Sequence, residues 1–134
     1  MATGTAGTTA RQYPYQMVHY LRRDITYADT GVLTVGIVPA GAIIVGAGVI
    51  VSVAFNAAGN DLLNLGTSGD PDGFATDLTL ATIGNIVWDE LATSNDLGPF
   101  TSDTTIVVEY TYTSTAPTAG AGSVYVLFIP DNDL

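Results

Sequence analysis

The chain of 134 residues contains no cysteine and no lysine. The missing cysteine excludes disulfide bonds, thiol catalysis and cysteine-ligated zinc. Charged residues make up only 12% of the chain, about half the usual globular share, whereas apolar residues reach 47%. Solubility therefore depends on hydroxyl and amide groups and on the net charge of −10, or a partner covers part of the surface.

Positive charge is confined to the beginning of the chain. Arg11, Arg22 and Arg23 are the only strongly basic residues, and the single histidine, His19, lies among them. All 13 acidic residues lie at or after Asp24. Because clustered Lys and Arg neutralise phosphates, the acidic part of the chain is expected to repel nucleic acid. We therefore predict no nucleic-acid partner and a cationic lead that faces another protein.

Apolar alternation predicts short strands and no amphipathic helix. The first strand is expected from Tyr13 onward, with Leu21 on one face and Tyr20 and Arg22 on the other. Further strands are expected at residues 32–38, 42–45, 49–55, 62–65, 78–83, 86–88, 104–113 and 123–129. The strand at 104–113 places four residues on one face: Ile106, Val108, Tyr110 and Tyr112.

Two stretches are harder to interpret. Residues 42–55 are almost continuously apolar but carry glycines at 46 and 48, which we interpret as a break between two strands. Their composition predicts burial on both faces, or a central position in a sandwich. Residues 67–77 are rich in turn residues and are predicted to be a long loop.

The order of these elements predicts the fold class. Strands at spacings of roughly 8 to 14 residues are typical of antiparallel sandwiches and barrels, and long connections between residues 56 and 103 favour Greek keys. We predict an all-β, antiparallel, jelly-roll-like β-sandwich of about eight strands. Residues 1–12 are expected to form an extended N-terminal arm, and residues 13–134 a single domain. The apolar run at 42–55 is too short to span a bilayer, so no membrane association is expected.

Few residues are suited to catalysis. His19 is the only histidine that could complete a Ser-His-Asp triad, and its place beside tyrosines on an alternating strand is typical of a packed residue. Glycosidases use two convergent carboxylates, and Asp89, Glu90 and Glu109 are the candidates. Adjacent strand residues point to opposite faces, however, so we interpret Asp89 and Glu90 after Trp88 as a solvated strand end. We predict no catalytic residues and no enzymatic activity.

A metal site is weighed against a turn at residues 70–73. Asp70 and Asp72 have the spacing of calcium ligands, but a third acid and a closing glutamate are missing. Pro-Asp-Gly is also an ordinary turn sequence. We predict a turn, with no metal and no cofactor.

Tyrosine and arginine gather near the N-terminus. These residue types are enriched at the centres of protein interfaces. The predicted partner-binding residues are Arg11, Tyr13, Tyr15, Tyr20, Arg22 and Arg23. An alternative stays open, in which this is an ordinary first strand whose arginines pair with Asp24 or Asp29.

Four stretches resemble small virion proteins of tailed bacteriophages, the jelly-roll head decoration (cement) proteins. They are PAGAIIVG at residues 39–46, VAFN at 53–56, LNLGTSGDPDGFA at 63–75 and DELATS at 89–94. Within the region from Pro39 to about Thr105, this resemblance covers about half the chain and consists of strand and turn sequences. It brings no active-site residues.

The resemblance implies a virion structural protein. Its expected partners are the major capsid protein and further copies of itself, as a dimer or trimer. The expected location is the outer capsid surface, after synthesis in the host cytoplasm, where the protein would clamp neighbouring capsomers. An alternative is a carbohydrate- or receptor-binding jelly-roll module of a phage tail fibre or spike, in which Trp88 or Tyr112 would stack on sugars.

Overall fold

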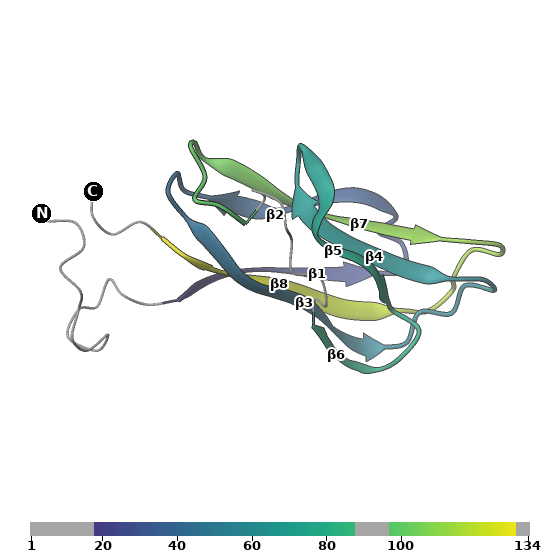
Figure 1. Ribbon diagram of the computed structural model, residues 1–134. Helices are drawn as coiled ribbons and strands as arrows, with labels where there is room; N and C mark the ends of the chain where they lie inside the picture. Colours follow the sequence, from purple (N-terminus) through teal and green to yellow (C-terminus); the bar gives the residue numbers. More distant parts are fainter. Residues whose placement is uncertain (1–17, 88–96, 131–134) are drawn as a thin grey trace, which may run out of the picture.

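The computed structural model describes residues 18–87 and 97–130, which form two packed β-sheets (Figure 1). The strands are β1 (His19–Thr26), β2 (Gly31–Val38), β3 (Ile43–Val53), β4 (Asp61–Thr67), β5 (Asp70–Thr79), β6 (Gly84–Val87), β7 (Thr104–Tyr112) and β8 (Ala121–Ile129). Sheet A has the order β1-β8-β3-β6, and sheet B has the order β2-β7-β4-β5. No helix in these two ranges is long and apolar enough to cross a membrane.

The connections between strands define a jelly roll. Only β4 and β5 are consecutive strands within one sheet, and every other connection between successive strands passes from one sheet to the other. All neighbouring strands pair antiparallel. Two four-stranded sheets linked in this way are the double-sheet jelly-roll architecture. The predicted fold class is therefore confirmed.

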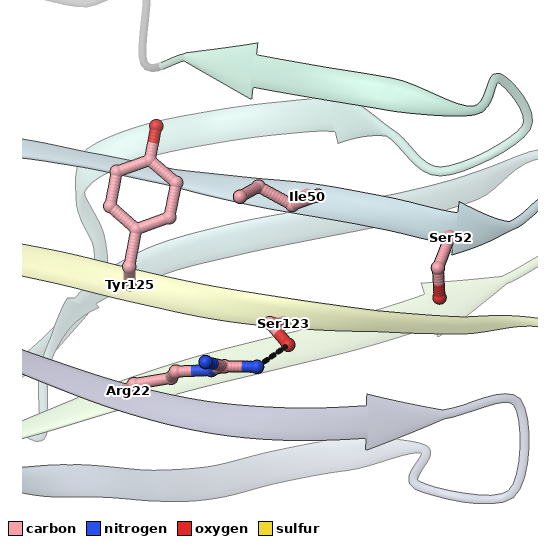
Figure 2. A pocket seen from close by; sticks show the side chains of 5 residues that line it. All are labelled: Arg22, Ile50, Ser52, Ser123 and Tyr125. Atoms are coloured by element: carbon pink, nitrogen blue, oxygen red, sulfur yellow. Dashed lines mark hydrogen bonds between the residues drawn. The ribbon is translucent and has the colours of Figure 1, made fainter.

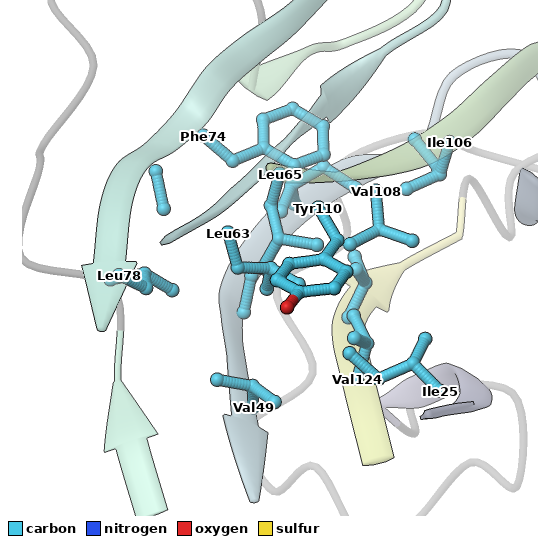
Figure 3. Close-up of a cluster of buried hydrophobic side chains, with 14 of the residues drawn as sticks. Ile25, Val49, Leu63, Leu65, Phe74, Leu78, Ile106, Val108, Tyr110 and Val124 are labelled. Atoms are coloured by element: carbon cyan, nitrogen blue, oxygen red, sulfur yellow. The ribbon is translucent and has the colours of Figure 1, made fainter. Parts of the chain in front are cut away.

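The core lies between the sheets and is built from alternate residues of the long strands. Sheet B contributes the largest side chains, among them Phe74 and Tyr110, and both are fully buried. Figure 3 shows Tyr110 between Leu65 of sheet B and Val49 and Val124 of sheet A, and Phe74 beyond Leu65. The ring of Tyr110 lies edge-on to Phe55, with 5.0 Å between the centroids. The predicted inward face of residues 104–113 is confirmed: Ile106, Val108, Tyr110 and Tyr112 all pack in or against the core.

The predicted break at glycines 46–48 is wrong, because β3 continues through them. A β-carbon on Gly48 would lie 2.7 Å from the hydroxyl oxygen of Tyr125 and 2.7 Å from the carbonyl oxygen of Ile86. The glycine thus permits close approach of neighbouring strands and is not a turn residue. The second expectation for this stretch is confirmed, since β3 occupies a central position in sheet A.

The predicted loop at residues 67–77 is also wrong, because β5 begins at Asp70 and forms a tight hairpin with β4. Register shifts interrupt the pairing of these two strands on either side of Leu65. Such bulges break the period-two alternation by which strands are recognised. The predicted start of the first strand at Tyr13 and the predicted arm at residues 1–12 lie outside the described residues.

Candidate functional site

The outer face of sheet A, which points away from the core, is unusually apolar. Most of the large exposed hydrophobic residues of the described chain lie on it: Tyr20, Ile43, Val45, Ile50, Val53, Val87 and Ile129. Ile50, near the middle of the face, is 49% exposed, and Val87 is 52% exposed. Several large apolar side chains exposed on one face mark it as a candidate interaction site.

The same face is electrically neutral. Among the described residues, Arg22 and Asp24 are its only charged side chains, and they form an ion pair at 3.4 Å. The other described acids lie on sheet B or in loops: Asp29, Asp61, Asp70, Asp72, Asp77, Asp103 and Glu109. A protein of net charge −10 therefore presents one broad surface without net charge.

A groove lies on this face, and Figure 2 shows the side chains that line it. Its volume is about 410 Å³, and its lining residues are Arg22, Ile50, Ser52, Ser123 and Tyr125. The Ser123 hydroxyl donates to Asp24 Oδ1 at 2.5 Å and accepts from Arg22 Nη2 at 3.1 Å. The Tyr125 hydroxyl donates to Asn85 Oδ1 at 2.9 Å, which holds the ring across β3. The polar side chains at the groove are thus held in place by hydrogen bonds within the chain.

The hydrogen bond from Ser123 is the main reason that the pKa of Asp24 lies below 3.8, its ordinary value, and the charge of Arg22 is the next. Replacing Ser123 with alanine is expected to raise the pKa of Asp24, which can be measured by NMR titration of its carboxyl group. Because the pKa is lowered by folding, the corresponding stabilisation is present above 3.8 and is lost as the pH falls through the folded-state pKa.

Ser52→Ala is the matched control for this titration. Ser52 lines the same groove, but its hydroxyl donates to the carbonyl oxygen of Ala121. The pKa of Asp24 is expected to stay unchanged in this variant. An unchanged pKa in Ser123→Ala as well would contradict the assigned cause.

The predicted partner-binding residues separate into three groups. Tyr20 is 67% exposed at the start of β1. Arg22 bonds to Asp24 and Ser123, as the alternative interpretation of the first strand expects. Arg23 bonds within the chain too, because its Nη1 donates to the carbonyl oxygen of Thr34 on β2 at 2.7 Å. Arg11, Tyr13 and Tyr15 lie outside the described residues. A role for these six residues in partner binding stays a prediction.

The other candidate residues lie apart from this face or outside the described chain. The ring of His19 packs against Phe128 at 5.7 Å between centroids. Tyr112 is half-buried, with its ring 6.3 Å from that of Tyr110, and so it offers no open platform for a sugar. Trp88, Asp89 and Glu90 lie outside the described residues. Within 18–87 and 97–130, no group of three or more His, Asp or Glu side chains could hold a metal ion.

Sequence reasoning missed the outer face of sheet A, although a signal for it was present. The near-continuous apolar run of β3 predicted burial on both faces, and the structure covers only the inner one. Ile50 and Val53 are left exposed on the other. We therefore take the exposed apolar face of sheet A as the candidate binding surface of this protein.

The fold is shared with chains from two phage capsid structures. One belongs to the cyanophage Pam1 capsid asymmetric unit, with 21% sequence identity, coverage of 84% of each chain and a TM-score of 0.64. The other belongs to the acidic stable capsid structure of Helicobacter pylori bacteriophage KHP30, with 15% identity, coverage of 84% of this chain and 86% of that chain, and a TM-score of 0.62. Similarity at these identities establishes a shared fold and no more. No family model matches the chain, and no curated protein sequence does.

Proposed function

We propose that this protein is a non-enzymatic structural component of a phage virion, which binds the outer surface of the capsid and clamps neighbouring capsomers. The observation that carries the proposal is the shared fold, because both similar chains come from phage capsids and each match covers 84% of this chain. A protein that binds the expanded shell more tightly than the unexpanded one stabilises the expanded form by mass action.

The distribution of charge supports a position outside the shell. The net charge is −10, and in the described residues the acids gather on sheet B and the loops. Such a protein is repelled by the packaged genome, because both carry dense negative charge. On the outer surface this repulsion is absent.

We assign docking on the shell to the N-terminal segment. It carries Arg11, Tyr13 and Tyr15 and continues into Tyr20, which is exposed. Arg22 and Arg23 contribute less, since both already bond within the chain. Tyrosine and arginine are the residues that most often dominate binding energy at interfaces.

Shells assembled from the major capsid protein encoded with this chain provide the test. The full chain is expected to co-sediment with expanded shells and to raise their disassembly temperature. A variant without residues 1–12 is expected to bind at least about tenfold more weakly, because it loses the arginine from the docking segment. Thermal melting of the free variant checks that the sandwich of residues 18–130 still folds.

A variant without residues 131–134 is the control for shortening the chain, and it is expected to bind like the full chain. Equal binding by the variant without residues 1–12 would contradict the assignment of docking to the N-terminal segment. Failure of the full chain to bind expanded shells would overturn the proposed function itself.

A further inference from the structure

On the outer face of sheet A, the apolar sequence predicts burial, but the side chains are exposed in the single chain. Its central strand β3 has the composition of a strand buried on both faces, and only its inner side is covered by the described chain. The neighbouring strand β8 is similar, because Tyr125, Leu127 and Ile129 point outward from the same strand as buried Val124. A second layer packed on this face would remove the contradiction.

We propose that the layer is a second copy of this chain, packed face to face through sheet A in a two-fold dimer. Charge favours a like partner here. Two molecules of net charge −10 repel one another over most of their surfaces. On this face Arg22 and Asp24 cancel, so two copies approach there at the lowest electrostatic cost.

The face is also complementary to itself. The strand register aligns two adjacent rows across sheet A, one of Arg22, Tyr125, Gly48 and Val87, and one of Asp24, Ser123, Ile50 and Asn85. Consider a two-fold axis that lies between the stacked sheets, runs parallel to the two rows and is midway between them. Rotation about this axis places the first row of one copy over the second row of the other copy. Arg22 then faces the partner's Asp24, so opposite charges meet.

The same operation matches large side chains with small ones. Tyr125 of one copy faces the partner's Ser123, which is one of the residues that line the groove. Stacked sheets lie about 10 Å apart with interdigitated side chains, and isologous two-fold contacts are the commonest form of homo-oligomer.

The first test is the mass of the purified full chain in solution, measured by sedimentation velocity over a range of concentrations. The wild type is expected to have twice the monomer mass. Ile50→Lys, at the centre of the face, is expected to weaken the dimer at least about tenfold, because it buries a charge in an apolar contact. Ile37→Lys is the matched control, because Ile37 is 60% exposed on sheet B and Ile50 is 49% exposed. It is expected to leave the dimer unchanged.

The second test uses the charge pair. Arg22→Asp leaves two acids on the face, and Asp24→Arg leaves two arginines, so each variant alone is expected to be monomeric, because like charges oppose each other across the axis. An equimolar mixture of the two variants is expected to form a heterodimer, in which every acid faces an arginine. Changes within one chain cannot produce this rescue, because neither chain in the mixture regains its own ion pair.

The dimer does not depend on the proposed capsid function, and the two can fail separately. A wild-type monomer or trimer at micromolar concentrations would overturn the dimer. So would an Ile50→Lys variant that dimerises like the wild type, or a mixture of charge variants that stays monomeric. If the wild type is a monomer and Ile50→Lys abolishes its binding to shells, the face binds the shell and not a second copy. That result would also contradict the dimer.

Discussion

Replacing Asp61 with alanine is expected to lower the free energy of unfolding by about 3 kcal/mol, because one buried and one partly buried donor lose their acceptor. Asp61 is only 3% exposed. Its Oδ1 accepts a hydrogen bond from the Tyr110 hydroxyl at 2.6 Å, and its Oδ2 accepts one from the backbone N–H of Ala57 at 2.9 Å. The carboxylate thus ties the inner face of β7 to the connection between β3 and β4. Urea denaturation followed by tryptophan fluorescence or circular dichroism measures the loss.

Tyr110→Phe separates the two bonds, because it removes the hydroxyl donor and leaves the contact between Asp61 and Ala57. Its expected cost is about 1–2 kcal/mol, and the double variant is expected to cost less than the sum of the single ones, since the residues share a bond. Additive losses would contradict direct coupling. Burial and then the bond to Asp61 raise the pKa of Tyr110, so its stabilising contribution is complete below pH 10.0 and declines only in stronger alkali.

Gly66→Ala is expected to cost about 3 kcal/mol or more by overpacking. The new β-carbon would lie 2.0 Å from the carbonyl oxygen of Asp70 and 2.6 Å from the carbonyl carbon of Pro71. These are backbone atoms of β5, which cannot turn aside as a side chain can. The variant must therefore move β5 away from β4, and its melting temperature is expected to fall by several degrees.

Gly69→Ala is the matched control in the same hairpin. A β-carbon there meets nothing closer than Thr67 Oγ1 at 4.0 Å. Its expected effect is within about 0.5 kcal/mol, as for a surface substitution away from packed features. Equal melting temperatures for the two variants would show that the hairpin does not pack on Gly66 in solution.

Strands with regular alternation were predictable from sequence. Residues 104–113 alternate strongly, interrupted only at Val107, and β7 has the expected inward face with Tyr110 on it. The closing strand at 123–129 is also correct within two residues at its start. Local pattern suffices in these strands because a regular pairing register preserves the period of two along the whole element.

Two other elements, β3 and the β4–β5 hairpin, could not be predicted from local alternation. In β3, Gly48 is required by Tyr125, which is distant in sequence. In the β4–β5 hairpin, Gly66 is required by backbone that folds over it, and bulges erase the alternation. A glycine that prevents a clash and a glycine that makes a turn look the same in a sequence, because only the position of a remote atom distinguishes them.

The candidate site, too, was predictable from the sequence only in part. The sequence by itself determined an all-β chain without thiol chemistry, with its few cations near the N-terminus and few charged residues among many apolar ones. Only the tertiary structure decided which apolar residues are exposed and where they lie. The register of four strands gathers Tyr20, Ile50 and Val87 on one outer face and sets the ion pair of Arg22 and Asp24 beside them. Neighbours across a sheet are set by long-range pairing, and so no local pattern could place the neutral apolar face on sheet A.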